Sequence, residues 1–86
     1  MATNNGNGKG WDVDLNRIKA KERRAFQADT QKSAEDDSVM WKWYAKVIKA
    51  WPLQGNPADE SVYPELGMME LLEVERQFVA AFPKPD

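Results

Sequence analysis

The stretch of sequence that is most informative about the fold is VMWKWYAKVIKAWP, residues 39–52. Apolar side chains recur in it every three or four positions, which is the period of an α-helix with one buried face. These apolar positions are Val39, Met40, Trp43, Tyr44, Val47, Ile48 and Trp51. Pro52 has no backbone N–H and therefore ends a helix. The stretch predicts an amphipathic helix that continues to Trp51.

The start of this helix is signalled a few residues earlier. Ser33 precedes Asp36 by three positions, which is the spacing of a helix N-cap and an acidic partner. Acidic residues 35–37 would lie in the first turn and lysines in later turns, the order that the helix dipole favours. We therefore expect this helix to begin near Ser33.

A first helix is expected upstream, over residues 17–29. Leu15, Ile18, Ala25 and Phe26 are spaced as one face of a helix, and basic residues lie mostly outside that face. Asp14 or Asn16 could accept hydrogen bonds from the first free amides. Trp11 and Val13 alternate with aspartates just before it, over too short a stretch to predict a sheet.

A third helix is expected over residues 64–81. Pro64 is suited to the first helical position. The predicted apolar stripe consists of Leu66, Met69, Leu72, Val79 and Phe82, widened by Met68, Leu71 and Phe78. Gly67 disfavours a helix interior, so the helix could begin one turn later. Residues 52–64 hold three prolines and predict a loop.

These elements predict an all-α fold, a small three-helix domain with a flexible N-terminal tail. The second and third helices are expected to pack antiparallel. Residues 1–10 contain three Asn and three Gly without apolar periodicity, which predicts a disordered tail. Residues 11–86 are expected to form a single helical domain, because 86 residues leave no room for a second one.

Composition excludes most catalytic chemistry. The chain has no Cys and no His, which rules out disulfides, Cys/His zinc sites, cysteine nucleophiles and histidine-dependent acid–base catalysis. Paired carboxylates remain, but the sequence places none of them in an apolar pocket that would separate their pKa values. Residues 6–10 contain alternating glycines without a preceding strand, so they do not predict a phosphate-binding loop. We expect a protein that is not an enzyme and that binds no metal or cofactor.

Charge is distributed unevenly along the chain. The net charge is +3 over residues 1–32, zero over residues 33–56 and −5 over residues 57–86, which sums to −2. The two ends could attract each other within the fold, or one of them could be a charged docking face. A run of basic residues also allows a small helical nucleic-acid-binding module as an alternative, although the acidic balance of the chain disfavours it. The residues concerned are Arg17, Lys19, Lys21, Arg23 and Arg24.

Four tryptophans are unusual in so short a chain. Trp43 and Trp51 lie on the apolar stripe of the second helix and are expected in the core. Trp41 lies off that stripe and Trp11 precedes the first helix, so either could be an exposed anchor for a partner protein or could cover the edge of the core. Met68 and Met69 join these two as candidate partner-binding residues because thioether side chains adapt to varied surfaces. The alternative, that the two methionines are core residues, is favoured over a role in partner binding.

The order of features from residue 12 to residue 82 resembles that of small tail assembly chaperones and related small helical proteins of tailed bacteriophages. The resemblance is carried by Asp14-Leu15, Ile18, Arg23-Arg24-Ala25-Phe26, Val47-Ile48-Lys49-Ala50-Trp51-Pro52, Gly55-Asn56-Pro57, Tyr63, Leu66 and the closing acidic helix. It implies a non-enzymatic protein that binds long, aggregation-prone helical tail components during virion assembly.

The kind of partner stays open at the level of sequence. A phage-encoded inhibitor or adaptor that binds a host protein would carry the same features, and surplus aromatic residues also allow a homo-oligomer. The sequence shows no secretory signal layout and no apolar run long enough for a membrane span. We therefore expect a cytoplasmic protein without a membrane partner, in the host cytoplasm if it is viral.

Overall fold

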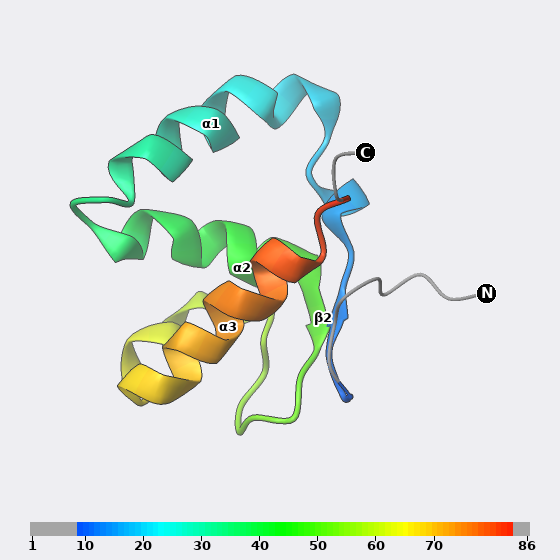
Figure 1. The fold of residues 1–86 in the computed structure, drawn as a ribbon, viewed down its shortest axis with the longest axis vertical. Helices are drawn as coiled ribbons and strands as arrows, with labels where there is room; N and C mark the ends of the chain where they lie inside the picture. The colour runs from blue at the N-terminus through cyan, green and yellow to red at the C-terminus, as the bar shows by residue number, and fades with distance from the viewer. Residues whose placement is uncertain (1–8, 84–86) are drawn as a thin grey trace.

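The computed structural model describes residues 9–83, in which helices predominate and two short strands form a sheet (Figure 1). The expectation of a purely all-α fold is therefore corrected to a mainly helical fold with a two-stranded sheet. The elements, with η for 3-10 helices, are β1 (Asp12–Val13), η1 (Leu15–Arg17), η2 (Ala20–Glu22), α1 (Arg23–Lys32), η3 (Asp37–Met40), α2 (Trp41–Val47), β2 (Ile48–Ala50), η4 (Glu60–Glu65) and α3 (Met68–Ala80).

The predicted tail, residues 1–10, lies outside the described residues except for Lys9 and Gly10. Gly10 has a positive φ of 86°, a conformation that glycine adopts without strain. A Cβ added to Gly10 would lie 3.4 Å from the Cβ of Pro52, so the chain runs close to Pro52 at this point. Among residues 9–83, no helix has both the length and the apolar character needed to cross a membrane.

The sheet overturns two predictions. Strand β1 pairs antiparallel with β2, with Asp12 opposite Ala50 and Val13 opposite Ile48, where the sequence predicted a lone extended segment. The predicted second helix also ends at Val47 instead of Trp51, because residues from Ile48 onward are extended. The amide of Asp14 donates to the carbonyl of Val47 at 2.8 Å, the carbonyl that residue 51 would need in a continued helix. Pairing with β1 therefore replaces the last helical turn.

The first helix is shorter at its start and longer at its end than the sequence predicted. Ile18 and Lys19 have extended backbones, which divides residues 15–22 into η1 and η2 before α1 begins. The side chain of Asp14 accepts from the amide of Asn16 at 3.0 Å and caps η1. The carboxylate of Glu22 accepts from the amide of Lys19 at 2.9 Å and caps η2.

The start of the second helical segment lies at Asp36, not at Ser33. Ser33 is the C-cap of α1, where its amide donates to the carbonyl of Asp29 at 2.9 Å. The Asp36 side chain accepts from the amide and the hydroxyl of Ser38 and opens η3, which leads directly into α2. The acidic residue predicted to be the partner of the cap is therefore the cap itself.

The third helix is split by Gly67. Residues 60–65 form η4, capped by Asp59, and α3 begins at Met68 after an extended Leu66 and Gly67. The residues of α3 that are buried are Val74, Gln77 and Phe78. The predicted core stripe through Met69, Leu72 and Val79 is therefore wrong, since these side chains are exposed.

The core is built largely from aromatic side chains. The ring centroids of Tyr44 and Phe78 are 5.0 Å apart, and those of Trp51 and Tyr63 are 5.4 Å apart. The Tyr63 hydroxyl donates to the carbonyl of Pro57 at 2.7 Å, which anchors the loop between β2 and η4. Val47 is fully buried at the centre.

Helices α2 and α3 are not antiparallel as predicted. In Figure 1 the chain runs from left to right along α2 and again from left to right along α3. The reason is that β2, the loop after it and η4 carry the chain back to the side where α2 begins (Figure 1). Helix α1 lies on the other side of α2, and the Trp43 indole N–H donates to Asp29 of α1 at 2.9 Å.

Candidate functional site

Helix α3 presents a row of large apolar side chains to solvent. The exposed fractions are 78% for Met68, 75% for Met69, 48% for Leu72 and 67% for Val79. We call these four residues the α3 stripe. They lie at helical spacing on the side of α3 opposite its buried residues. Single exposed apolar residues are ordinary on protein surfaces, whereas a row of them is typical of an interaction surface.

A shallow hollow lies along the C-terminal part of the α3 stripe. Leu72, Glu75, Arg76, Val79 and Ala80 line it. Leu72 and Val79 are about two turns apart, so the hollow joins these two residues of the stripe, and Met68 and Met69 lie outside it. Its walls are apolar with one acidic and one basic side chain, which is the composition of a surface for a polypeptide.

The start of α3 places both methionines in its first turn. Gly67 is extended, and its amide donates to Glu70 Oε1 at 3.0 Å. This contact satisfies one of the amides that a helix start leaves free. Met68 and Met69 therefore begin the helix at its exposed end and do not reach the core.

The opposite face of α3 is held firmly against the rest of the domain. Val74 is fully buried and Phe78 is 5% exposed. The Phe78 ring lies 5.0 Å from the Tyr44 ring and 6.0 Å from the Phe26 ring, measured between centroids. These contacts fix the rotation of α3 about its axis, so the α3 stripe faces outward.

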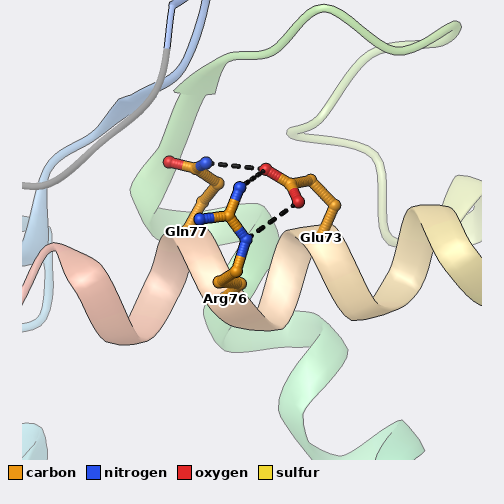
Figure 2. Close-up of polar contacts among 3 residues, drawn as sticks. All are labelled: Glu73, Arg76 and Gln77. Carbon is orange, nitrogen blue, oxygen red and sulfur yellow. Dashed lines mark hydrogen bonds and ion pairs between the residues drawn. The ribbon is translucent and has the colours of Figure 1, made fainter.

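A polar network borders one edge of the stripe (Figure 2). Arg76 Nε donates to Glu73 Oε1 at 3.0 Å, and Gln77 Nε2 donates to Glu73 Oε2 at 2.7 Å. Figure 2 shows the Arg76 guanidinium and the Gln77 amide both directed toward the Glu73 carboxylate. Hydrogen bonds from these two donors lower the pKa of Glu73, and the bond from Gln77 has a larger effect than the bond from Arg76. The positive charge of Arg76 is thereby matched within the helix.

The other edge of the stripe carries a carboxylate without a cation. Glu75 lines the hollow and makes no ion pair among the described residues. Burial raises the pKa of Glu75, and the negative charge of Asp37 in η3 raises it further. Asp37 likewise lacks an ion pair within residues 9–83. The negative charges of Glu75 in α3 and Asp37 in η3 thus repel each other.

Trp11 is not an exposed anchor, which corrects one expectation. It is 5% exposed, and its ring lies edge-on to Trp51 at a centroid distance of 6.1 Å. Pairing of β1 with β2 brings the two indoles together, which sequence spacing did not reveal.

Trp41 is half-buried and packs against the core. Its indole Nε1 is buried, and no hydrogen-bond partner for it occurs among residues 9–83. Trp43 and Trp51 are buried as predicted. Of the four predicted partner-binding residues, Met68 and Met69 therefore lie together on the surface, whereas Trp11 is buried.

The five cations of the predicted nucleic-acid alternative are all exposed: Arg17, Lys19, Lys21, Arg23 and Arg24. None of them forms an ion pair with a carboxylate in the part of the chain that the structure describes. The neighbouring acids Glu22 and Asp29 instead pair with Lys46 and Lys42 of α2. Among residues 9–83, no ion pair joins the basic segment, residues 1–32, to the acidic segment, residues 57–86.

Several carboxylates of the acidic clusters cap helices. Asp14, Asp36 and Asp59 each accept from an amide two residues later. Hydrogen bonds from Ser38 and from Ser61 lower the pKa of Asp36 and of Asp59. Within residues 9–83, no group of three or more acidic side chains is placed to hold a metal ion.

Sequence reasoning did not identify Leu72 and Val79 as surface residues. The signal that could have revealed them is the surplus of apolar positions in residues 68–80. Val74 and Phe78 mark one helical face, while Met68, Leu72 and Val79 mark another. A helix with one core contact can bury only one of these faces.

Comparison of the chain with protein-family models, with curated proteins and with solved structures found no match.

Proposed function

We propose that this chain is a non-enzymatic protein-binding domain and that a partner polypeptide docks on the α3 stripe. The observation that carries the proposal is the exposure of Met68, Met69, Leu72 and Val79 on a helix whose other face already fills the core. Transfer of apolar surface from water to a protein contact is favourable. Recognition between helices uses apolar anchors at this spacing.

The proposed partner is a helical component of a bacteriophage tail, bound in the host cytoplasm during virion assembly. This part of the proposal rests on the resemblance of residues 12–82 to tail assembly chaperones. Two adjacent methionines in the stripe support it, because flexible thioethers adapt to successive segments of a long helical partner.

The proposal is tested by site-specific photocrosslinking in phage-infected cells. A photoreactive residue, p-benzoylphenylalanine, replaces Val79 in the α3 stripe, and a matched variant carries it at Lys32, an exposed position of α1. We expect the residue 79 variant to form a covalent adduct with a tail structural protein, identified by mass spectrometry. The residue 32 variant should not form it.

Two outcomes would contradict the proposal. Equal yields of the same adducts at residues 79 and 32 would show that the α3 stripe is not the binding surface. An adduct at residue 79 with a host protein, formed equally in uninfected cells, would replace the tail component with a host partner and favour an inhibitor or adaptor.

A second candidate function is nucleic-acid binding through Arg17, Lys19, Lys21, Arg23 and Arg24. The observation that favours it is that all five cations are exposed without an intramolecular carboxylate partner among the described residues. Phosphate binding by such cations weakens steeply as salt rises. Fluorescence anisotropy with a labelled oligonucleotide at increasing NaCl concentration tests this, and absence of binding at low salt would exclude it.

A further inference from the structure

The charges around the α3 stripe are predominantly negative. Residues 68–80 contain Glu70, Glu73 and Glu75 but only one cation, Arg76. Arg76 is paired with Glu73, so it offers no unmatched positive charge to a partner (Figure 2). The surface that a docking helix would meet is therefore an apolar row with an acidic border.

The unmatched acidic charge is concentrated at one edge of the stripe. Glu75 lies in the hollow between Leu72 and Val79, and it is close enough to Asp37 for their negative charges to interact. Neither carboxylate has an ion-pair partner within residues 9–83. A cation placed beside Glu75 would relieve the repulsion between the two acids, since opposite charges at short range attract.

Two surfaces of a second copy of the chain do not match the α3 stripe. Its own α3 stripe has the same acidic border, so two copies would bring like charges together. Its cationic helix α1 has no buried residues, and its large apolar residue, Phe26, is engaged with Trp43 at a centroid distance of 5.3 Å. Neither surface combines an exposed apolar row with positive charge.

We propose that the occupant of the α3 stripe is a basic amphipathic helix of another protein. Its apolar side chains would pack between Met68 and Val79, and a Lys or Arg beside them would contact Glu75. Helix α3 has 13 residues and is about 20 Å long, so a partner segment of similar length would cover it. This inference rests on the proposed function and specifies the chemistry of the partner.

Synthetic peptides test the charge requirement directly. Three 18-residue peptides are used: an amphipathic helix with Lys beside its leucine stripe, the same helix with Glu replacing each Lys, and a scrambled Lys peptide that lacks the stripe. Binding to the full chain is measured by isothermal titration calorimetry at 50 mM and 300 mM NaCl. We expect the basic amphipathic peptide to bind at least about tenfold more tightly than the other two, with weaker binding at high salt.

Variants of the protein assign the contacts. The double variant Asp37→Asn/Glu75→Gln removes both unmatched charges and should weaken binding of the basic amphipathic peptide about fivefold. Glu60→Gln is the charge control and should leave affinity unchanged. Glu60 is an exposed residue of η4, and its side chain forms no ion pair among residues 9–83. Leu72→Ser/Val79→Ser should abolish binding of this peptide, and circular dichroism verifies that each variant is folded.

The outcomes separate this inference from the proposed function. Equal binding of the basic and acidic amphipathic peptides, both abolished by Leu72→Ser/Val79→Ser, would overturn the basic partner and support docking on the α3 stripe. Binding of the basic peptide that persists in that variant would place it elsewhere and overturn the inference. Failure of every peptide to bind, or a dimer in sedimentation velocity that Leu72→Ser/Val79→Ser dissociates, would also overturn it.

Discussion

At the scale of single residues, the environment of Glu75 differs from what its sequence position indicates. It lies on a helix surface, yet burial and the charge of Asp37 raise its pKa. The folded state then holds the proton more tightly than the unfolded state does. The free energy of unfolding therefore falls as the pH rises from the ordinary glutamate pKa through the raised value.

The first prediction concerns this pair of acids. Asp37→Asn removes the neighbouring negative charge, so the pKa of Glu75 should shift downward toward its ordinary value, leaving the contribution of burial. NMR titration of the Glu75 carboxyl carbon measures the shift. Glu35→Gln, two residues from Asp37 and exposed, is the control and should leave the Glu75 titration closer to that of the unmodified chain. An unchanged Glu75 pKa in Asp37→Asn would show that the two groups do not interact.

At the scale of elements, α3 has two apolar faces, and packing selects between them. The face with Val74 and Phe78 is buried, while the face with Leu72 and Val79 is exposed. Phe78 contacts the rings of Tyr44, Phe26 and Phe82, which makes that face the better fit to an aromatic core.

The second prediction compares one valine from each face. Val74→Ala should lower the free energy of unfolding by about 2 kcal/mol, because it leaves a cavity at a fully buried site. Val79→Ala removes the same two methyl groups from an exposed site and should change stability by less than about 0.5 kcal/mol. Urea denaturation followed by circular dichroism measures both values. A loss of stability larger than about 0.5 kcal/mol for Val79→Ala would mean that the α3 stripe is not exposed in solution.

At the scale of the whole molecule, the short sheet connects the beginning of the described chain to its centre. Strand β1 pairs with β2, and this pairing places Trp11 against Trp51. The Trp51 indole N–H donates to the carbonyl of Gly55 at 2.9 Å, so the same cluster also holds the loop that follows β2. Segments far apart in sequence therefore stabilise one another through two tryptophans.

The third prediction follows from this arrangement. Trp11→Ala should lower the free energy of unfolding by about 3–5 kcal/mol, because it empties a buried site. In a domain this small, such a loss is a large share of the total stability. Lys9→Ala, at an exposed residue close by, is the control and should have little effect. Thermal unfolding measured by near-ultraviolet circular dichroism distinguishes the variants, and equal melting temperatures would contradict burial of Trp11.

The candidate site was predictable only in part. Met68 and Met69 were named as candidates from the chemistry of their side chains although the sequence favoured core positions for them, and both are exposed. Leu72 and Val79 were assigned to the core, because apolar periodicity shows that a face exists without showing what covers it. Trp11 was a possible surface anchor because it precedes the first predicted helix, and its packing partner Trp51 is 40 residues away in the sequence, beyond the reach of local spacing.

The sequence by itself determined approximately where the helical segments lie but not where they end, since helical periodicity acts over a few neighbouring residues whereas α2 ends at Val47, before Pro52, where the chain pairs with β1. It also determined the excess of acidic charge in residues 57–86 and the absence of Cys and His chemistry. Only the tertiary structure decided that Ile48–Ala50 are extended and that α3 turns Val74 inward. Both outcomes depend on contacts between distant segments, whose free energy exceeds the small local preferences that a sequence pattern records.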